Sequence, residues 1–356
     1  MNLSEDPNLF VHQLDVARDR VLVMRVSEDD LRAASFLNDR LLEPRPGETL
    51  RDTQWVDWSE VADASEDEAQ GPRDDARFIF HIGHVGSTLL ARLLGEASDT
   101  LALREPHILR QFAQLRVTEG LAHSPWPAGR VAERLPLARQ WLSRSFRDGQ
   151  RALIKATSFV SDIAPDLIEG SRKAVFLTLT PERFLQTILA AEASRQELAI
   201  ESSKRLQRLN NQITSKAGAE PIKLWELDEA KRAAMAWACE MTALNAATRA
   251  ARDEGARENV LWQDFDAFLA EPGETLAGVA AHLEVGLSAE QAARWVQGPI
   301  MTRYSKAPEQ GYSPRYREEV LERAAREYEN PIRAALRWLD AMGKQHPAIA
   351  DALDRV

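Results

Sequence analysis

The sequence predicts an α/β fold in which a parallel sheet is covered by helices. Five short apolar runs, at 78–82, 100–106, 151–157, 174–179 and 259–265, have the length and composition of buried strands. Each run is followed by sequence compatible with a helix. Strands that alternate with helices in this way form parallel sheets flanked by helices on both faces.

Long helical insertions separate the predicted strands. The stretches 107–147, 182–208 and 227–252 have Leu and Ala at the spacing of amphipathic helices, and the part of the chain beyond residue 271 is helical again. Insertions between strands of a parallel sheet commonly build the wall of a substrate site above the strand ends. We therefore expect these helices to shape a binding pocket.

A small leading α/β unit precedes the main sheet. It combines a strand, VLVMRV (21–26), a helix opened by the N-cap residue Ser27 and a Trp-rich segment, QWVDWSEV (54–61). The acidic, polar stretch 63–76 is typical of a solvated loop. The sequence thus predicts an N-terminal accessory unit with an acidic linker at 1–75 and a main domain at 76–356.

Composition excludes several classes of protein. The chain has 45 basic and 55 acidic side chains and a net charge of -10, which argues against a nucleic-acid-coating protein. It lacks both a run of about 18 apolar residues and a signal-peptide pattern, so we expect a cytoplasmic protein without a membrane span. The single cysteine, Cys239, is expected to pack in the core. His81 and His84 lack neighbouring ligand residues, so no metal site is expected.

The turn between the first main strand and its helix, HIGHVGSTLL (81–90), has the features of an anion site. Such a turn directs several backbone N–H groups at one point, where the helix N-terminus adds a partial positive charge. Gly83 and Gly86 permit tight curvature, and Ser87 and Thr88 supply hydroxyl donors. The alternative is an ordinary tight connection in which Ser87 caps the helix.

Neither standard nucleotide-binding pattern fits this turn. A Walker A loop requires G-x-x-x-x-G-K-[ST], but here the two glycines are three residues apart and Ser87 stands where the lysine would be. The third glycine of a G-x-G-x-x-G fingerprint is also absent.

The chain instead resembles the sulfotransferases that use 3′-phosphoadenosine 5′-phosphosulfate (PAPS) as donor, bacterial members in particular. HVGSTLL (84–90) is similar to their first signature, and AVFLTLTPERFLQTIL (174–189) is similar to their second. The resemblance continues in REP (104–106), LIKATS (153–158), LWQDFDAFLAEPGETLAGVAAHLEV (261–285) and YSKAPEQGYSPRYREEVL (304–321). It covers residues 78 to about 340 and implies a P-loop, sulfotransferase-like fold.

The resemblance implies a set of site residues. PAPS, the co-substrate that leaves as 3′-phosphoadenosine 5′-phosphate (PAP), would bind the loop, and a hydroxyl acceptor would approach a base. The implied catalytic residues are His84, Glu105 and Lys155, with Glu105 as the base. The implied donor-binding residues are Gly83, Gly86, Ser87, Thr88, Arg183, Thr187 and Lys306. His107 is a weaker alternative base.

The chain departs from the family pattern at residues that carry charge. His84 stands in place of the permanent cation of the first signature, and Leu179 and Thr180 stand in place of the Arg and Asp of the second. A hydrogen bond to a charged group contributes about 1.5 to 3 kcal/mol, so Arg183, Lys155 or Lys306 would have to compensate.

Two other functions stay open from the sequence. A P-loop kinase of small molecules would need a loop lysine, which is missing, and a magnesium-binding carboxylate, for which Asp264 is the candidate. A non-catalytic protein that keeps the fold but binds another ligand or a protein partner would explain the altered signatures. The acceptor, a small molecule or a peptide hydroxyl, and the oligomeric state are left undetermined.

Overall fold

A five-stranded, all-parallel sheet forms the centre of the molecule, as predicted. The computed structural model describes residues 6–38, 52–66, 73–214, 220–304, 307–311 and 313–356. The strand order is β5-β6-β4-β7-β8. The strands are β4 (Arg77–His81), β5 (Thr100–Arg104), β6 (Arg151–Lys155), β7 (Ala174–Thr178) and β8 (Val260–Asp264). Each lies within the apolar run that predicted it or starts one residue before it, because those runs are the segments that can be buried on both faces.

The strand order creates a topological switch point at the central strand. From β4 the chain crosses to β5 at one edge of the sheet, and from β6 it crosses back over β4 to β7 and then to β8. Connections that leave in opposite directions open a crevice outside the carboxyl ends of the strands, where ligands of α/β proteins bind. The predicted anion loop directly follows the carboxyl end of β4.

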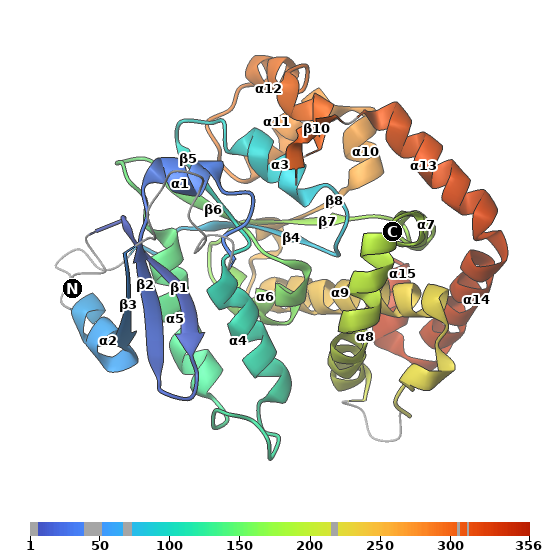
Figure 1. The fold of residues 1–356 in the computed structure, drawn as a ribbon, viewed down its shortest axis with the longest axis horizontal. Coiled ribbons are helices and arrows are strands. Elements are labelled where there is room, and N and C mark those ends of the chain that lie inside the picture. The colour runs from blue at the N-terminus through green and yellow to red at the C-terminus, as the bar shows by residue number, and fades with distance from the viewer. Residues whose placement is uncertain (1–5, 39–51, 67–72, 215–219, 305–306, 312) are drawn as a thin grey trace.

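Helices cover both faces of the sheet (Figure 1). Helix α3 (Ser87–Leu94) lies on one face together with α10 (Phe265–Ala270), α11 (Pro272–His282) and α12 (Ala289–Trp295). The other face carries α4 (His107–Thr118), α5 (Arg130–Ser143), α6 (Ala164–Ile168), α8 (Glu192–Ile213) and α9 (Glu229–Asp253). The helices α7 (Pro181–Ala190), α13 (Pro314–Glu327), α14 (Glu329–Gln345) and α15 (Pro347–Leu353) lie at the right of the view, and β10 (Ala307–Gly311), which pairs with β9 (Arg303–Tyr304), lies beside α11.

Two of the predicted long helices are interrupted. The stretch predicted at 107–147 forms α4 and α5 with a loop between them, and the stretch at 182–208 breaks at Ala191, whose φ of -123° and ψ of 126° are extended. The third, predicted at 227–252, is the continuous helix α9, in which Cys239 is fully buried as expected.

The leading unit packs against the edge of the main sheet. Its antiparallel strands are β1 (Leu9–Asp15), β2 (Arg20–Arg25) and β3 (Thr53–Asp57), and its helices are α1 (Glu28–Ala33) and α2 (Trp58–Glu66). Ser27 caps α1 as predicted, through a capping box with Asp30. Arg104, at the end of β5, donates to the carbonyls of Arg32 (2.6 Å) and Ala34 (2.9 Å). This buried guanidinium anchors the unit on β5.

The prediction of a solvated loop over 63–76 is wrong for 63–66, which are helical, and half right for 73–76, which form a loop that is half-buried or buried. Helix α2 extends to Glu66, and the segment returns to the protein before β4. There Asp74 accepts hydrogen bonds from Arg139 at 2.8 Å and from Arg172, and Ala76 is buried. Acidic residues favour solvent in general, but two buried or half-buried arginines give this carboxylate partners within the fold.

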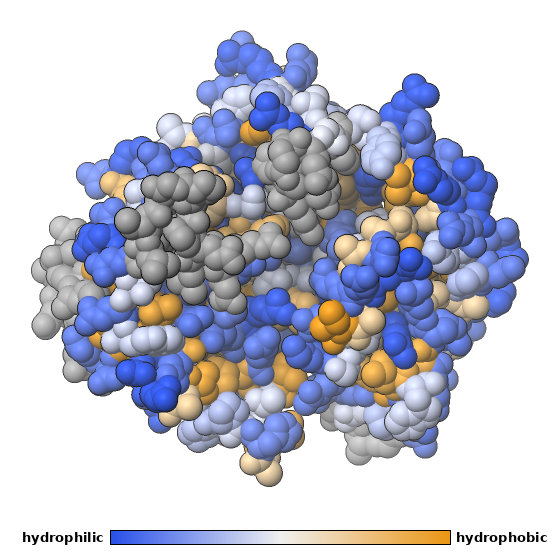
Figure 2. All heavy atoms as spheres, in the orientation of Figure 1, coloured by the Kyte–Doolittle hydropathy of each residue, from blue (hydrophilic) through white to orange (hydrophobic). Residues whose placement is uncertain are grey.

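The face of the molecule shown in Figure 2 is mainly hydrophilic. Hydrophobic residues on it form separate patches between charged ones. Within the described ranges, the helices are too short or too polar for any of them to cross a membrane.

Candidate functional site

The loop after β4 has the geometry of an anion site. Gly83 and Gly86 adopt positive φ angles of 94° and 67°, and α3 starts directly after Gly86. Ser87 and Thr88, in the first turn of α3, are 4% and 3% exposed. The Thr88 hydroxyl has no hydrogen-bond partner among the described residues. A buried hydroxyl without a partner costs free energy, and an anion in the cavity that Thr88 lines would accept a hydrogen bond from it.

Gly86 is fixed by its contact with the aromatic ring of Phe265. Phe265 is the first residue after β8. A Cβ atom built on Gly86 would lie only 2.0 Å from an atom of the Phe265 ring. Only glycine combines this close approach with a positive φ. The guanidinium of Arg317, on α13, lies 5.3 Å from the centre of the same ring. Phe265 therefore connects the loop to a cation from the C-terminal helices.

His81 is the last residue of β4, and His84 lies in the middle of the turn that follows. The backbone N–H of Gly83 donates to His81 Nδ1 at 3.0 Å, so in the neutral ring the proton lies on Nε2. His84 has a φ of 55°. Its Nδ1 lies 3.4 Å from the Ser194 hydroxyl, and its Nε2 lies 3.5 Å from a carboxylate oxygen of Glu197. Both Ser194 and Glu197 belong to α8.

Glu105 is the other candidate catalytic residue in a left-handed conformation, with a φ of 57°. The conformation is held from both sides. The Glu105 N–H donates to the carbonyl of Lys155 at 2.7 Å. On the other side, the Leu37 N–H donates to the carbonyl of Arg104 at 2.7 Å, and the Leu37 carbonyl accepts from the His107 N–H at 3.0 Å. Non-glycine residues in this region cost about 1 to 3 kcal/mol and occur often at functional sites. The Glu105 side chain forms an ion pair with Lys155.

Two cavities adjoin the loop and share His81 and His84. The first has a volume of about 230 Å³, and its lining includes Ser87, Thr88, Lys155, Thr187, Phe265, Arg317 and Leu321. The second, of about 210 Å³, has a lining that includes Phe36, Gly83, Glu105, Arg110, Phe159, Glu197 and Glu201. The loop therefore borders both cavities, with Ser87 and Thr88 in the first and Gly83 in the second.

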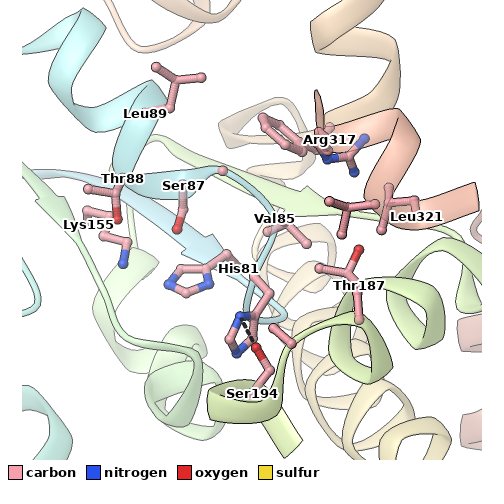
Figure 3. A pocket seen from close by; sticks show the side chains of 16 residues that line it. His81, Val85, Ser87, Thr88, Leu89, Lys155, Thr187, Ser194, Arg317 and Leu321 are labelled. Carbon is pink, nitrogen blue, oxygen red and sulfur yellow. Dashed lines mark hydrogen bonds between the residues drawn. The ribbon is translucent and has the colours of Figure 1, made fainter. Parts of the chain in front are cut away.

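Figure 3 shows how side chains meet around the first cavity. Ser87 and Thr88 lie at the start of α3 beside Lys155, and Arg317 and Leu321 face them from α13. Thr187 and Ser194 project from α7 and α8 at the lower side. The walls away from the loop are mainly apolar, with Phe265 and Val320. This cavity can hold a ligand that combines an anionic end with a flat apolar part.

The second cavity is more strongly charged. Arg110 donates to Glu201 at 2.9 Å, and its guanidinium lies 4.9 Å from the centre of the Phe159 ring. Phe36 comes from the leading unit, and the Lys155 ammonium lies 5.9 Å from the centre of its ring. The leading unit thus supplies one wall of this cavity.

The structure brings most of the predicted site residues together. His84, Glu105, Lys155, Gly83, Gly86, Ser87, Thr88 and Thr187 all line one or both cavities. His107, the alternative base, does not line either cavity and stacks on His12. Lys306 lies outside the described residues.

Arg183 lines neither cavity. It donates to Asp266 and Glu318, both at 2.6 Å. Burial opposes its charge, but these two carboxylates raise the pKa of Arg183 above its usual range. Leu179, which replaces the arginine of the second signature, is fully buried, and the Thr180 side chain caps α7. The second signature thus supplies Thr187 to the cavity and, in this arrangement, no cation.

Sequence reasoning missed three groups that the site contains. Arg317 pairs with Asp266 at 2.8 Å and lines the first cavity. Ser194 and Glu197 approach His84 from α8, and Phe36 comes from the leading unit. Only the first had a signal in the sequence, because Arg317 lies within the tail segment 304–321 of the resemblance.

The comparisons with known proteins return likenesses to solved structures only. No family model and no curated protein matches the chain. It is similar to the sulfotransferase domain from the curacin biosynthetic pathway, at 13% identity over 76% of this chain and 99% of that one, with a TM-score of 0.38. It is also similar to a sulfotransferase from Alicyclobacillus acidocaldarius (16% identity, 74% and 95% covered, TM-score 0.34). A third is mouse sulfotransferase SULT7A1 complexed with PAP (9%, 63% and 64% covered, TM-score 0.31). Likenesses at this level say nothing about the chemistry of this chain, which depends on its own residues.

Proposed function

We propose that the chain transfers a sulfuryl group from PAPS to the hydroxyl of an acceptor, as its sequence signatures imply. The observation that carries the proposal is the anion loop that borders two cavities, with the buried Thr88 hydroxyl lacking a partner among the described residues. In-line transfer needs donor and acceptor on opposite sides of the moving group. A loop that borders two cavities supports this arrangement.

The first cavity is proposed as the donor site. The loop N–H groups and the hydroxyls of Ser87 and Thr88 would hold the 5′-phosphosulfate, and Phe265 with Leu321 would contact the adenosine. Thr187 and Arg317 are proposed contacts of the remaining phosphate. Arg183 and Lys306 stay candidates for the same role, and Arg183 would have to exchange Asp266 or Glu318 for the phosphate.

The second cavity is proposed as the acceptor site. There Glu105 would accept the hydroxyl proton while the acceptor oxygen bonds to sulfur and the bond between sulfur and the bridging oxygen of the donor breaks. The electron pair of that bond leaves with PAP. Lys155 and a protonated His84 would stabilise the charge that develops on the leaving phosphate. The acceptor is a small molecule or a peptide that presents a hydroxyl.

A kinase function has less support. Asp264, its candidate magnesium ligand, accepts a hydrogen bond from the Ala267 N–H at 2.8 Å and caps α10. It lines neither cavity. One observation favours the non-catalytic alternative. Arg183, which lies near the place where the family has a donor-binding cation, forms ion pairs with Asp266 and Glu318.

Binding of PAP separates these functions. The melting temperature of the chain is measured with PAP and, in parallel, with ATP and magnesium, since a ligand of the native state raises it. A rise of the melting temperature with PAP and a smaller one with ATP is expected. A rise with ATP alone would point to the kinase, and no response to PAP would contradict the proposed function. Binding of PAP without transfer to any hydroxyl acceptor would indicate the non-catalytic alternative.

A further inference from the structure

The His84 ring contacts one face of α8. Ser194 and Glu197 are three residues apart, so they lie on the same side of this helix. Ser194 meets Nδ1 of the His84 ring at 3.4 Å and Glu197 meets Nε2 at 3.5 Å. The histidine side chain is 19% exposed and the glutamate side chain is 47% exposed. Both ring nitrogens therefore face oxygen atoms of a single helix.

We infer that Glu197 is a positioning residue that keeps the His84 imidazole protonated, so that its positive charge lies beside the anion loop. The inference rests on the proposed function, since it assigns the origin of the loop cation to a residue outside both signatures. A neutral imidazole carries one N–H, whereas the protonated ring carries two and can donate to both oxygens. A nearby carboxylate stabilises the protonated form.

The other charged groups around His84 do not replace Glu197. The groups that share a cavity with His84 are His81, Glu105, Arg110, Lys155, Glu197, Glu201 and Arg317. Each of the three cations has a carboxylate partner, namely Glu201 for Arg110, Glu105 for Lys155 and Asp266 for Arg317. Arg205 lies 4.0 Å from Glu197, but it also lies 3.7 Å from the buried Glu240. Glu197 lies 3.5 Å from Nε2 of the imidazole.

The arrangement gives His84 the role of a conditional cation. Where a permanent cation binds the donor at any pH, a histidine binds it only while protonated. The sign is fixed by this chemistry: affinity for the anionic donor is high at low pH and falls as pH rises. Glu197 extends that affinity toward neutral pH.

The test compares PAP affinity by titration calorimetry from about pH 5.5 to 8 in the parent chain, Glu197→Gln and Glu192→Gln. Glu192 is an exposed carboxylate on the same helix and serves as the matched control. At pH 5.5 the three chains should bind PAP about equally, and at pH 7 Glu197→Gln should bind about tenfold more weakly than the other two. A loss of the same factor at every pH would indicate a merely structural role and overturn the inference.

A second pair of variants tests whether the effect passes through His84. His84→Lys supplies a permanent cation, so its PAP affinity should vary little with pH, and adding Glu197→Gln should change it by less than about twofold. A full tenfold loss in the double variant would show that Glu197 acts independently of the imidazole and would overturn the inference.

A measurement without nucleotide keeps the inference separate from the proposed function. The His84 ring signals are followed by NMR as a function of pH, with assignment from His84→Lys. The ring should titrate at lower pH in Glu197→Gln than in the parent chain. Equal titration in both chains refutes the role of Glu197 even if PAP binds, and absence of PAP binding refutes the proposed function even if the titrations differ.

Discussion

Lys155 and Glu105 form an ion pair whose two members face different cavities. Lys155 is 1% exposed and lines the proposed donor cavity, whereas the Glu105 side chain is 22% exposed and lines the proposed acceptor cavity. Uptake of a proton by Glu105 would weaken its hold on the ammonium just as charge develops on the leaving group. The pair thus connects the proposed base with the proposed stabiliser of the leaving phosphate.

Replacing Glu105 by Gln should separate binding from turnover. The variant keeps the shape of the side chain but cannot accept the acceptor proton, so turnover should fall by about 10²- to 10⁴-fold while PAP affinity changes little. Calorimetry with PAP and a transfer assay measure the two effects. Retention of more than a tenth of the parent turnover would exclude Glu105 as the base.

The same pair predicts a coupling in stability. Glu105→Gln leaves a buried ammonium without its counter-ion, whereas the double variant with Lys155→Met removes both charges. The double variant should therefore be more stable than Glu105→Gln, by about 1 to 3 kcal/mol in urea unfolding. Additive effects of the two substitutions would mean that the pair is not formed in solution.

Removing both loop hydroxyls should abolish donor binding. Two hydrogen bonds to a charged group contribute about 3 to 6 kcal/mol together, so Ser87→Ala with Thr88→Ala should weaken PAP by roughly 10²- to 10⁴-fold. Ser98→Ala, at an exposed position after the other end of α3, is the control and should bind PAP normally. If the loop variant and the control bind PAP with equal affinity, the loop hydroxyls are not part of the donor site.

Gly86 and Gly83 should respond differently to alanine. A Cβ at Gly86 would meet Phe265 at 2.0 Å, whereas one at Gly83 would lie 3.7 Å from the Ser158 hydroxyl. Both substitutions carry the cost of a positive φ, about 1 kcal/mol, and Gly86→Ala adds overpacking of about 1 to 3 kcal/mol. Urea unfolding measures the difference. Adding Phe265→Ala to Gly86→Ala should remove the clash, so a double variant that shows no relief would contradict this packing.

Arg317 should contribute more to donor binding than Arg183. Arg317→Gln removes the cation that lines the cavity and should weaken PAP by about tenfold, whereas Arg183→Gln should change the affinity by less than about threefold. Calorimetry on both variants at one pH makes the comparison. The reverse order would show that Arg183 leaves Asp266 and Glu318 to reach the nucleotide.

Much of the fold was predictable because buried parallel strands have a simple signature. The five apolar runs mark the main sheet, and the glycines with the following hydroxyls mark the loop, since both features are local in the sequence. The position of Arg317 opposite Thr88 was not predictable in detail, because it depends on how α13 crosses the end of the sheet. Glu197 and Phe36 are harder still. Each lies in an ordinary amphipathic or loop segment, and only tertiary packing brings it to the loop.

One departure from the family pattern has a reason in the core. Where the second signature has an arginine after β7, this chain has Leu179, which is fully buried and whose carbonyl accepts a hydrogen bond from the Trp237 indole at 3.0 Å. A polar side chain at this position would be buried inside the core. The charge that faces the first cavity from the C-terminal elements comes from α13 instead.

A crystal structure of the chain with bound PAP would test the proposed donor site. We expect the 5′-phosphate on the loop, within hydrogen-bond distance of the Thr88 hydroxyl and the backbone N–H groups around Gly86, with the nucleotide in the cavity lined by Phe265 and Arg317. A nucleotide bound at another place, or a 5′-phosphate out of reach of Ser87 and Thr88, would contradict it.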